Sequence, residues 1–127
     1  MKFRYTILYV KDVKATLGFY TTAFNLKQKM LHESGDYGEL DTGTTILSFS
    51  SLELMAQLGK SPKAADTKAP TFEIAFETDD VVAGLEKAVS AGATLVQDAT
   101  KMPWGQTVGY VSDLNGFLVE ICTAVES

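Results

Sequence analysis

One order of predicted elements occurs twice in this chain, and this repeat constrains the fold more than any other feature. The first half predicts a strand, a helix and three further strands, at residues 3–10, 13–24, 27–33, 37–41 and 44–51. The second half predicts the same order, at residues 71–77, 81–89, 94–98, 108–111 and 117–122. Such self-similarity is typical of an internal duplication. We therefore expect two βαβββ modules, at residues 1–58 and 71–127.

Local signals mark the ends of both predicted helices. Asp12 and Asp80 precede apolar residues at helical spacing and are suitable N-caps. Asn25 and Gly92 follow the two stripes and are suitable helix stops. Between the modules, residues 59–70 are polar and contain two of the three prolines. We interpret this segment as a linker, with a lid over a binding cleft as the alternative.

Composition excludes several classes of protein. The 127 residues carry a formal charge of −5, which argues against a nucleic-acid surface, because phosphate binding needs clustered Lys and Arg. No apolar run approaches the roughly 20 residues that span a bilayer, and the N-terminal apolar run is too short for a signal peptide. Cys122 is the single cysteine, so no intrachain disulfide forms. We expect a cytoplasmic protein with neither a membrane nor a nucleic acid as partner.

Glu120 is the chemically most informative residue. It is the one charged residue in the apolar strand 117–122, where a carboxylate costs free energy unless it is paired, bound to a metal or facing water. Superposing the two halves through their helix starts places Tyr5 on Glu73, and superposing the last turns places Leu47 on Glu120. Glu73 and Glu120 are then two carboxylates facing one cleft. They suit a hard cation or general acid–base chemistry, with Glu120 as the candidate catalytic residue. The alternative is a Glu120 that only hydrogen-bonds water or Tyr5.

Several motifs together resemble those of the vicinal oxygen chelate superfamily, which holds glyoxalase I, the bleomycin-resistance proteins and the extradiol dioxygenases. They are the Val-x-Asp strand end at residues 10–12, Phe19-Tyr20, Ala91-Gly92-Ala93, Pro103-Trp104-Gly105 and Asp113-Leu114-Asn115-Gly116 with Glu120. The resemblance covers nearly the whole chain. It implies an α+β fold of two βαβββ modules that form an open, cleft-enclosing mixed β-sheet barrel, and usually a homodimer.

The metal-ligand positions implied by this resemblance are mostly altered. They fall on Tyr5, Leu47, Glu73 and Glu120, of which only Glu120 keeps the pattern of His, Glu, His or Gln, and Glu. We therefore favour no metal or other cofactor. If a divalent metal binds, Glu73 and Glu120 hold it, because carboxylates suit Mg²⁺, Ca²⁺ or Mn²⁺. The single histidine, His32, is interpreted as an ordinary histidine on a strand surface.

We expect a small-molecule-binding protein of the glyoxalase/bleomycin-resistance type, with an apolar, aromatic or cationic ligand held without a transition metal. Aromatic walls with a few polar groups are typical of such sites. For Phe49 and Tyr110, plain core packing is an equal alternative. The other functional class is a divalent-metal-dependent lyase, isomerase or dioxygenase, and a third is a dimeric interaction module. The candidate ligand-binding residues are Tyr5, Ile7, Leu47, Phe49, Glu73, Trp104, Tyr110 and Glu120.

Overall fold

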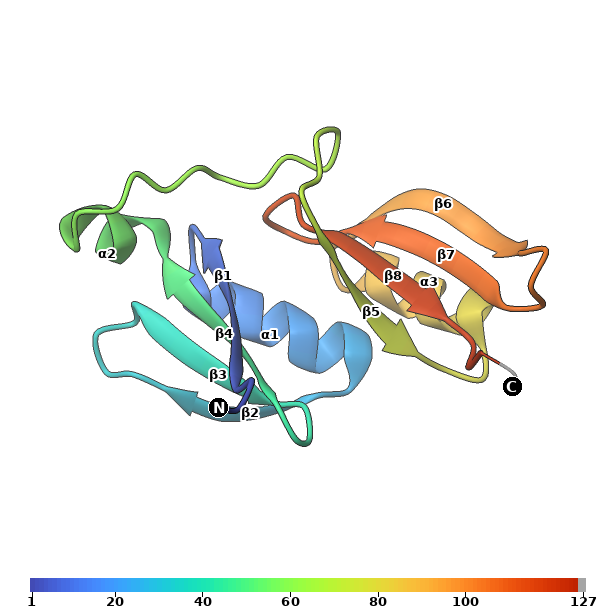
Figure 1. The fold of residues 1–127 in the computed structure, drawn as a ribbon, viewed down its shortest axis with the longest axis horizontal. Coiled ribbons are helices and arrows are strands. Elements are labelled where there is room, and N and C mark those ends of the chain that lie inside the picture. The colour runs from blue at the N-terminus through green and yellow to red at the C-terminus, as the bar shows by residue number, and fades with distance from the viewer. Residues whose placement is uncertain (126–127) are drawn as a thin grey trace. The chain divides into compact units, whose positions relative to one another are not determined.

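The computed structural model describes residues 1–125, which divide into two compact units, the first ending at Ala65 and the second beginning at Asp66 (Figure 1). Unit 1 contains β1 (Tyr5–Val10), α1 (Val13–Phe24), β2 (Lys27–Leu31), β3 (Tyr37–Asp41), β4 (Ile46–Ser51) and α2 (Leu52–Gln57). Unit 2 contains β5 (Glu73–Glu77), α3 (Val81–Ser90), β6 (Thr94–Lys101), β7 (Thr107–Ser112) and β8 (Leu118–Cys122).

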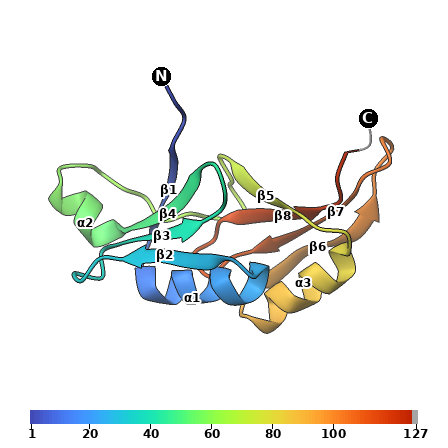
Figure 2. The ribbon, with the colours of Figure 1, turned by 90° about the horizontal axis from the view of Figure 1, so that it is seen from below.

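Each unit is a four-stranded mixed sheet with one long helix on one face (Figure 2). The strand order is β1-β4-β3-β2 in unit 1 and β5-β8-β7-β6 in unit 2. In each sheet the first two strands of this order run parallel and the other pairs run antiparallel. The predicted α+β fold of two βαβββ modules is confirmed. We call the face of each sheet opposite its long helix the open face.

The predicted helix ends are confirmed by their hydrogen bonds and backbone angles. The backbone N–H of Ala15 donates to Asp12 Oδ1 at 3.0 Å, and the N–H of Ala83 donates to Asp80 Oδ1 at 3.0 Å. Each carboxylate satisfies an N–H group that has no partner within the helix. Asn25, with φ of 56°, ends α1 in the left-handed conformation that stops a helix.

The turn between β7 and β8 also forms as its sequence predicts. The backbone N–H groups of Asn115 and Phe117 donate to Asp113 Oδ1 at 2.8 and 2.9 Å. An Asp side chain that bonds the backbone two residues ahead is the usual chemistry of such turns. This turn fixes the register of β7 against β8 and so determines which residue lies opposite Glu120.

Several strand ends differ from the prediction by one or two residues, and two larger differences are present. The sequence analysis missed α2, because its six residues are too few to show a helical period; Ser51 caps it, accepting from the N–H of Leu54 at 3.0 Å. The strand expected at 94–98 continues to Lys101, with register shifts against β7 along the way. Among the described residues, no helix has the length and apolarity needed to cross a membrane.

The superposition that matched Leu47 with Glu120 was wrong by one residue. In the parallel pair of unit 2, Glu120 lies opposite the residue two positions after Glu73. In unit 1, the residue two positions after Tyr5 lies opposite Ser48, not Leu47. Ser48 is therefore the counterpart of Glu120. The turns of the two halves differ by one residue in length, and a shift of one residue moves a strand position to the other face.

Leu47 and Phe49 consequently lie on the helix-covered face of the first sheet. The ring of Phe49 is fully buried and its centroid lies 5.2 Å from that of Tyr20 in α1. Leu47 is 7% exposed and lies two residues before Phe49 in β4, on the same face, so it also faces the core of unit 1. Leu47 and Phe49, both predicted to bind ligand, are thus core residues. For Phe49, core packing was the alternative that the sequence analysis gave.

Candidate functional site

The open face of the second sheet carries the two carboxylates that the sequence singled out. In β8, Val119 and Ile121 are buried on the side of α3. Because side chains alternate along a strand, Glu120 points to the opposite side, the open face. Tyr110 of β7 lies directly opposite Glu120 in the antiparallel pair, and Glu73 reaches the same place from β5. Three neighbouring strands therefore bring Glu73, Tyr110 and Glu120 together, and we call them the carboxylate cluster.

The electrostatics of the carboxylate cluster favour a protonated Glu120. Partial burial raises the pKa of Glu120, and both a hydrogen bond to Glu73 and the charge of Glu73 raise it further. Whenever Glu120 carries a proton, its hydroxyl can donate to an oxygen of Glu73. The hydroxyl of Tyr110 opposes this shift, because a donor to the carboxylate favours its charged form. Two carboxyl groups at hydrogen-bonding distance thus share one site.

Tyr110 supplies the hydroxyl group of the carboxylate cluster. Burial raises its pKa, and the charges of Glu120 and Glu73 act in the same direction. Tyr110 therefore stays a neutral phenol at physiological pH and remains a hydrogen-bond donor. Cys122, two residues after Glu120 and on the same face, has a raised pKa because of burial and then of the Glu120 charge. A thiol whose pKa is raised is a poor nucleophile.

Trp104 is held at the edge of unit 2 by a residue that the sequence analysis did not identify. The Trp104 side chain is 62% exposed, and its Nε1–H donates to Gln106 Oε1 at 2.9 Å. Gln106 Nε2 donates in turn to the backbone oxygen of Thr123 at 2.7 Å. Gln106 also hydrogen-bonds Cys122, which shares a face with Glu120. Through Gln106, the exposed indole is therefore tied to the end of β8, the strand that carries Glu120.

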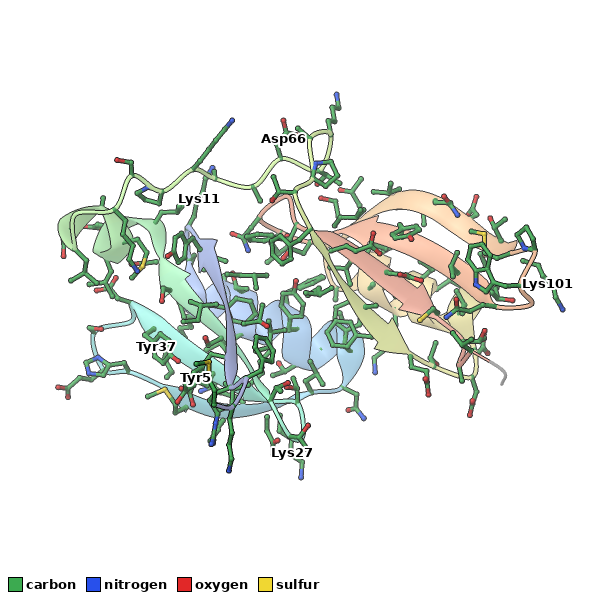
Figure 3. All side chains as sticks on the ribbon, viewed as in Figure 1. Tyr5, Lys11, Lys27, Tyr37, Asp66 and Lys101 are labelled. Carbon is green, nitrogen blue, oxygen red and sulfur yellow. The ribbon has the colours of Figure 1, made fainter. Side chains whose placement is uncertain are left out.

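The open face of unit 1 has a related but different set of side chains. The Tyr37 hydroxyl donates to Glu39 Oε2 at 2.7 Å, and burial raises the pKa of Tyr37. Ser48 hydrogen-bonds the Tyr37 hydroxyl, and Tyr5 lies near enough to contribute to the raised pKa of Tyr37. Tyr5 and Ile7 are both exposed. Figure 3 labels Tyr5 and Tyr37 on this sheet. Glu39 and Ser48 were not predicted, although alternation from Tyr37 places Glu39 on the same face.

His32 lies in unit 1, where its backbone N–H donates to the backbone oxygen of Tyr37 at 2.9 Å. It follows β2 directly, is exposed, and its Nδ1 lies 2.8 Å from Ser34 Oγ within the turn that leads to β3. The N–H of Ser34 also donates to Nδ1, at 3.1 Å. These bonds give the imidazole a local role in the turn.

A family model described as a glyoxalase-like domain matches residues 3–126. The chain belongs to this family. The match spans both units, and the repeated βαβββ topology agrees with membership of the vicinal oxygen chelate superfamily that the sequence motifs indicated. No curated protein matches the sequence significantly.

Several solved structures share this fold. A glyoxalase-related enzyme from Fulvimarina pelagi has a TM-score of 0.85 at 20% identity, covering 98% of this chain and 88% of its own. A glyoxalase/bleomycin resistance protein/dioxygenase family enzyme from Burkholderia phytofirmans PsJN has a TM-score of 0.77 at 22% identity, covering 96% and 97%. TioX from Micromonospora sp. ML1 has a TM-score of 0.72 at 20% identity, covering 97% and 98%. At these identities the likeness establishes the fold alone.

The metal-ligand positions that the sequence resemblance implies are Tyr5, Leu47, Glu73 and Glu120 in this chain. Imidazole is the usual nitrogen ligand of transition metals, and none of these four positions is a histidine. Within residues 1–125, no group of three or more His, Cys, Asp or Glu side chains is arranged to hold a metal. The donor set at the carboxylate cluster consists only of oxygen atoms, two carboxylates and a phenol.

Proposed function

We propose that this glyoxalase-like chain binds a small planar organic cation on the open face of unit 2, without a transition metal. The observation that carries the proposal is the hydrogen-bonded pair Glu73 and Glu120. In the described part of the chain, neither carboxylate has a Lys or Arg within ion-pair distance. When both groups are ionised, the two like charges repel each other, and either a proton on Glu120 or a bound cation relieves that repulsion.

The neighbouring aromatic groups support a planar ligand. Tyr110 stands within the carboxylate cluster, and the indole of Trp104 is exposed at the edge of the same unit. Aromatic faces attract cations, by about 0.5–1 kcal/mol at exposed sites and more where water is excluded. The similar structure from Burkholderia phytofirmans PsJN is a glyoxalase/bleomycin resistance protein/dioxygenase family enzyme, and this family name supports a small molecule as the ligand.

The test uses N-methylquinolinium as the cation and quinoline as a nearly isosteric, uncharged control at neutral pH, with binding measured by calorimetry. We expect the wild-type protein to bind the cation more tightly than quinoline. Glu120→Gln and Glu73→Gln should each weaken cation binding about tenfold and leave quinoline binding unchanged, since a partly buried charge pair contributes about 1–2 kcal/mol.

Glu77→Gln is the matched control. Glu77 shares the strand β5 and its face with Glu73, yet it lies outside the hydrogen-bonded pair. It should bind the cation as the wild type does. Equal binding of quinoline and N-methylquinolinium, or equal losses in all three Gln variants, would contradict the proposal.

A second candidate occupant is a hard divalent cation, favoured by the oxygen-only donor set of the carboxylate cluster. Glu73 and Glu120 would hold it, and it would supply a Lewis acid to a lyase, isomerase or dioxygenase reaction. Titration with Mn²⁺, followed by its paramagnetic effect on water relaxation, separates the two candidates. Stoichiometric Mn²⁺ binding that Glu120→Gln abolishes would favour this second function.

A further inference from the structure

Unit 2 contains a groove that has no part in the function proposed above. It lies between α3 and β6 and has a volume of about 390 Å³, within the range of small-molecule sites. Helix and strand are adjacent in both ribbon views (Figures 1 and 2). Four aliphatic side chains and two carboxylates line most of it: Val82, Leu85, Val89, Leu95, Glu86 and Asp98.

The apolar lining of this α3–β6 groove is unusually exposed. The exposed fractions are 55% for Val82, 43% for Val89 and 43% for Leu95. Val82, Glu86 and Val89 are spaced by four and three residues, so they form one stripe on a single side of α3. Exposed apolar side chains gathered in a concave site mark a surface that another molecule covers. The lining contains no aromatic ring, so it suits an alkyl chain more than a flat ring system.

Strand β6 contains a β-bulge where it borders the α3–β6 groove. Its register with β7 shifts between Gln97 and Thr100, so that Asp98 and Ala99 together lie opposite the single residue Gly109. The Thr100 hydroxyl donates to the Asp98 backbone oxygen at 2.9 Å, which closes this bulge. A bulge redirects side chains, and both bulged residues line the groove. It also interrupts the row of backbone groups that a strand of a second copy would need for pairing.

We propose that the α3–β6 groove binds a small amphiphilic cation, an alkylammonium whose chain lies on the aliphatic wall and whose charge lies between Glu86 and Asp98. Neither carboxylate has a basic partner in the part of the chain that the structure describes. A second copy of this chain is a less suitable occupant of this groove, because a chain with a net charge of −5 would be brought against Glu86 and Asp98. This inference is independent of the carboxylate cluster.

The probe is hexyltrimethylammonium, with hexanesulfonate as the anionic analogue, and binding is followed by the amide shifts of ¹⁵N-labelled protein. We expect saturable shifts confined to α3 and β6, with the cation bound more tightly than the sulfonate. Glu86→Gln with Asp98→Asn should weaken cation binding about tenfold, since each semi-exposed ion pair contributes up to about 1 kcal/mol. Val89→Thr, which keeps the side-chain shape and replaces a methyl group with a hydroxyl, should weaken binding of both probes.

Glu33→Gln with Glu53→Gln is the matched control, because it removes the same charge from exposed positions of unit 1. It should bind hexyltrimethylammonium as the wild type does. Four results would overturn the inference. The first three are saturable shifts found only outside α3 and β6, equal loss of binding in both double variants, and no saturable binding by a folded protein. A fourth is a concentration-dependent shift of the α3 and β6 amides without probe, which would show that a second copy covers the groove.

Discussion

At the scale of the residue, Glu120 shows how a single charge in an apolar strand marks a site. The strand places it beside Tyr110, and the parallel neighbour brings Glu73 to the same face. Because burial and Glu73 raise its pKa, the folded protein binds a proton at Glu120 more tightly than the unfolded chain does. The free energy of unfolding therefore falls as pH rises from the ordinary carboxyl range through the raised pKa of Glu120.

This linkage predicts the behaviour of Glu120→Gln. The amide resembles the protonated acid, since its NH₂ group donates to Glu73 and its oxygen accepts from Tyr110. Above the raised pKa, we expect the variant to be more stable than the wild type by roughly 0.5–1.5 kcal/mol, the range of one hydrogen bond. The difference should vanish at pH values low enough to protonate Glu120. Urea unfolding across this pH range checks the prediction, and a variant less stable than the wild type at every pH would contradict it.

At the scale of the element, each of the long helices α1 and α3 packs a leucine against a glycine of its sheet. A Cβ at Gly109 of β7 would lie 2.6 Å from Leu85 Cδ1 of α3, which is closer than side-chain atoms approach. Unit 1 repeats the arrangement, since a Cβ at Gly38 would lie 2.6 Å from Leu17 Cδ1. In these strands glycine therefore allows the core leucine of the helix to pack on the sheet.

Gly109→Ala should lower the free energy of unfolding by about 1–3 kcal/mol, because Leu85 has to leave its packed position. Gly18→Ala is the matched control: Gly18 is an exposed residue within α1, and a Cβ there meets nothing within 4 Å. We expect this second variant to gain about 0.5–1 kcal/mol from helix propensity. Denaturant unfolding of both proteins measures the difference. Similar changes in the two variants would contradict the close approach at Gly109.

The elements also show what sequence alone could establish. Strand alternation, the helical stripes and the caps Asp12 and Asp80 are local signals, and they predicted both modules correctly. The position of Ser48 was missed because a one-residue difference between turns is invisible until the strand register is known. Gln106 was missed because its contacts with Trp104 and Thr123 exist only in the folded unit.

At the scale of the whole molecule, the family match and the two similar units identify a glyoxalase-like protein in which the carboxylate cluster belongs to unit 2 alone. The sequence resemblance also implies a homodimer, which stays a prediction. Light scattering coupled to size-exclusion chromatography should give twice the mass of 13.8 kDa for this chain. A monomer at micromolar concentration would contradict it.

Proton release on binding tests the central claim most directly. A cation that binds between Glu73 and Glu120 favours the ionised pair, so Glu120 must lose its proton when N-methylquinolinium binds near the raised pKa of Glu120. Calorimetry in two buffers of different ionisation enthalpy should show proton release by the wild type, tighter binding as pH rises, and neither effect in Glu120→Gln. Binding by the wild type without proton release, at an affinity independent of pH, would contradict the account.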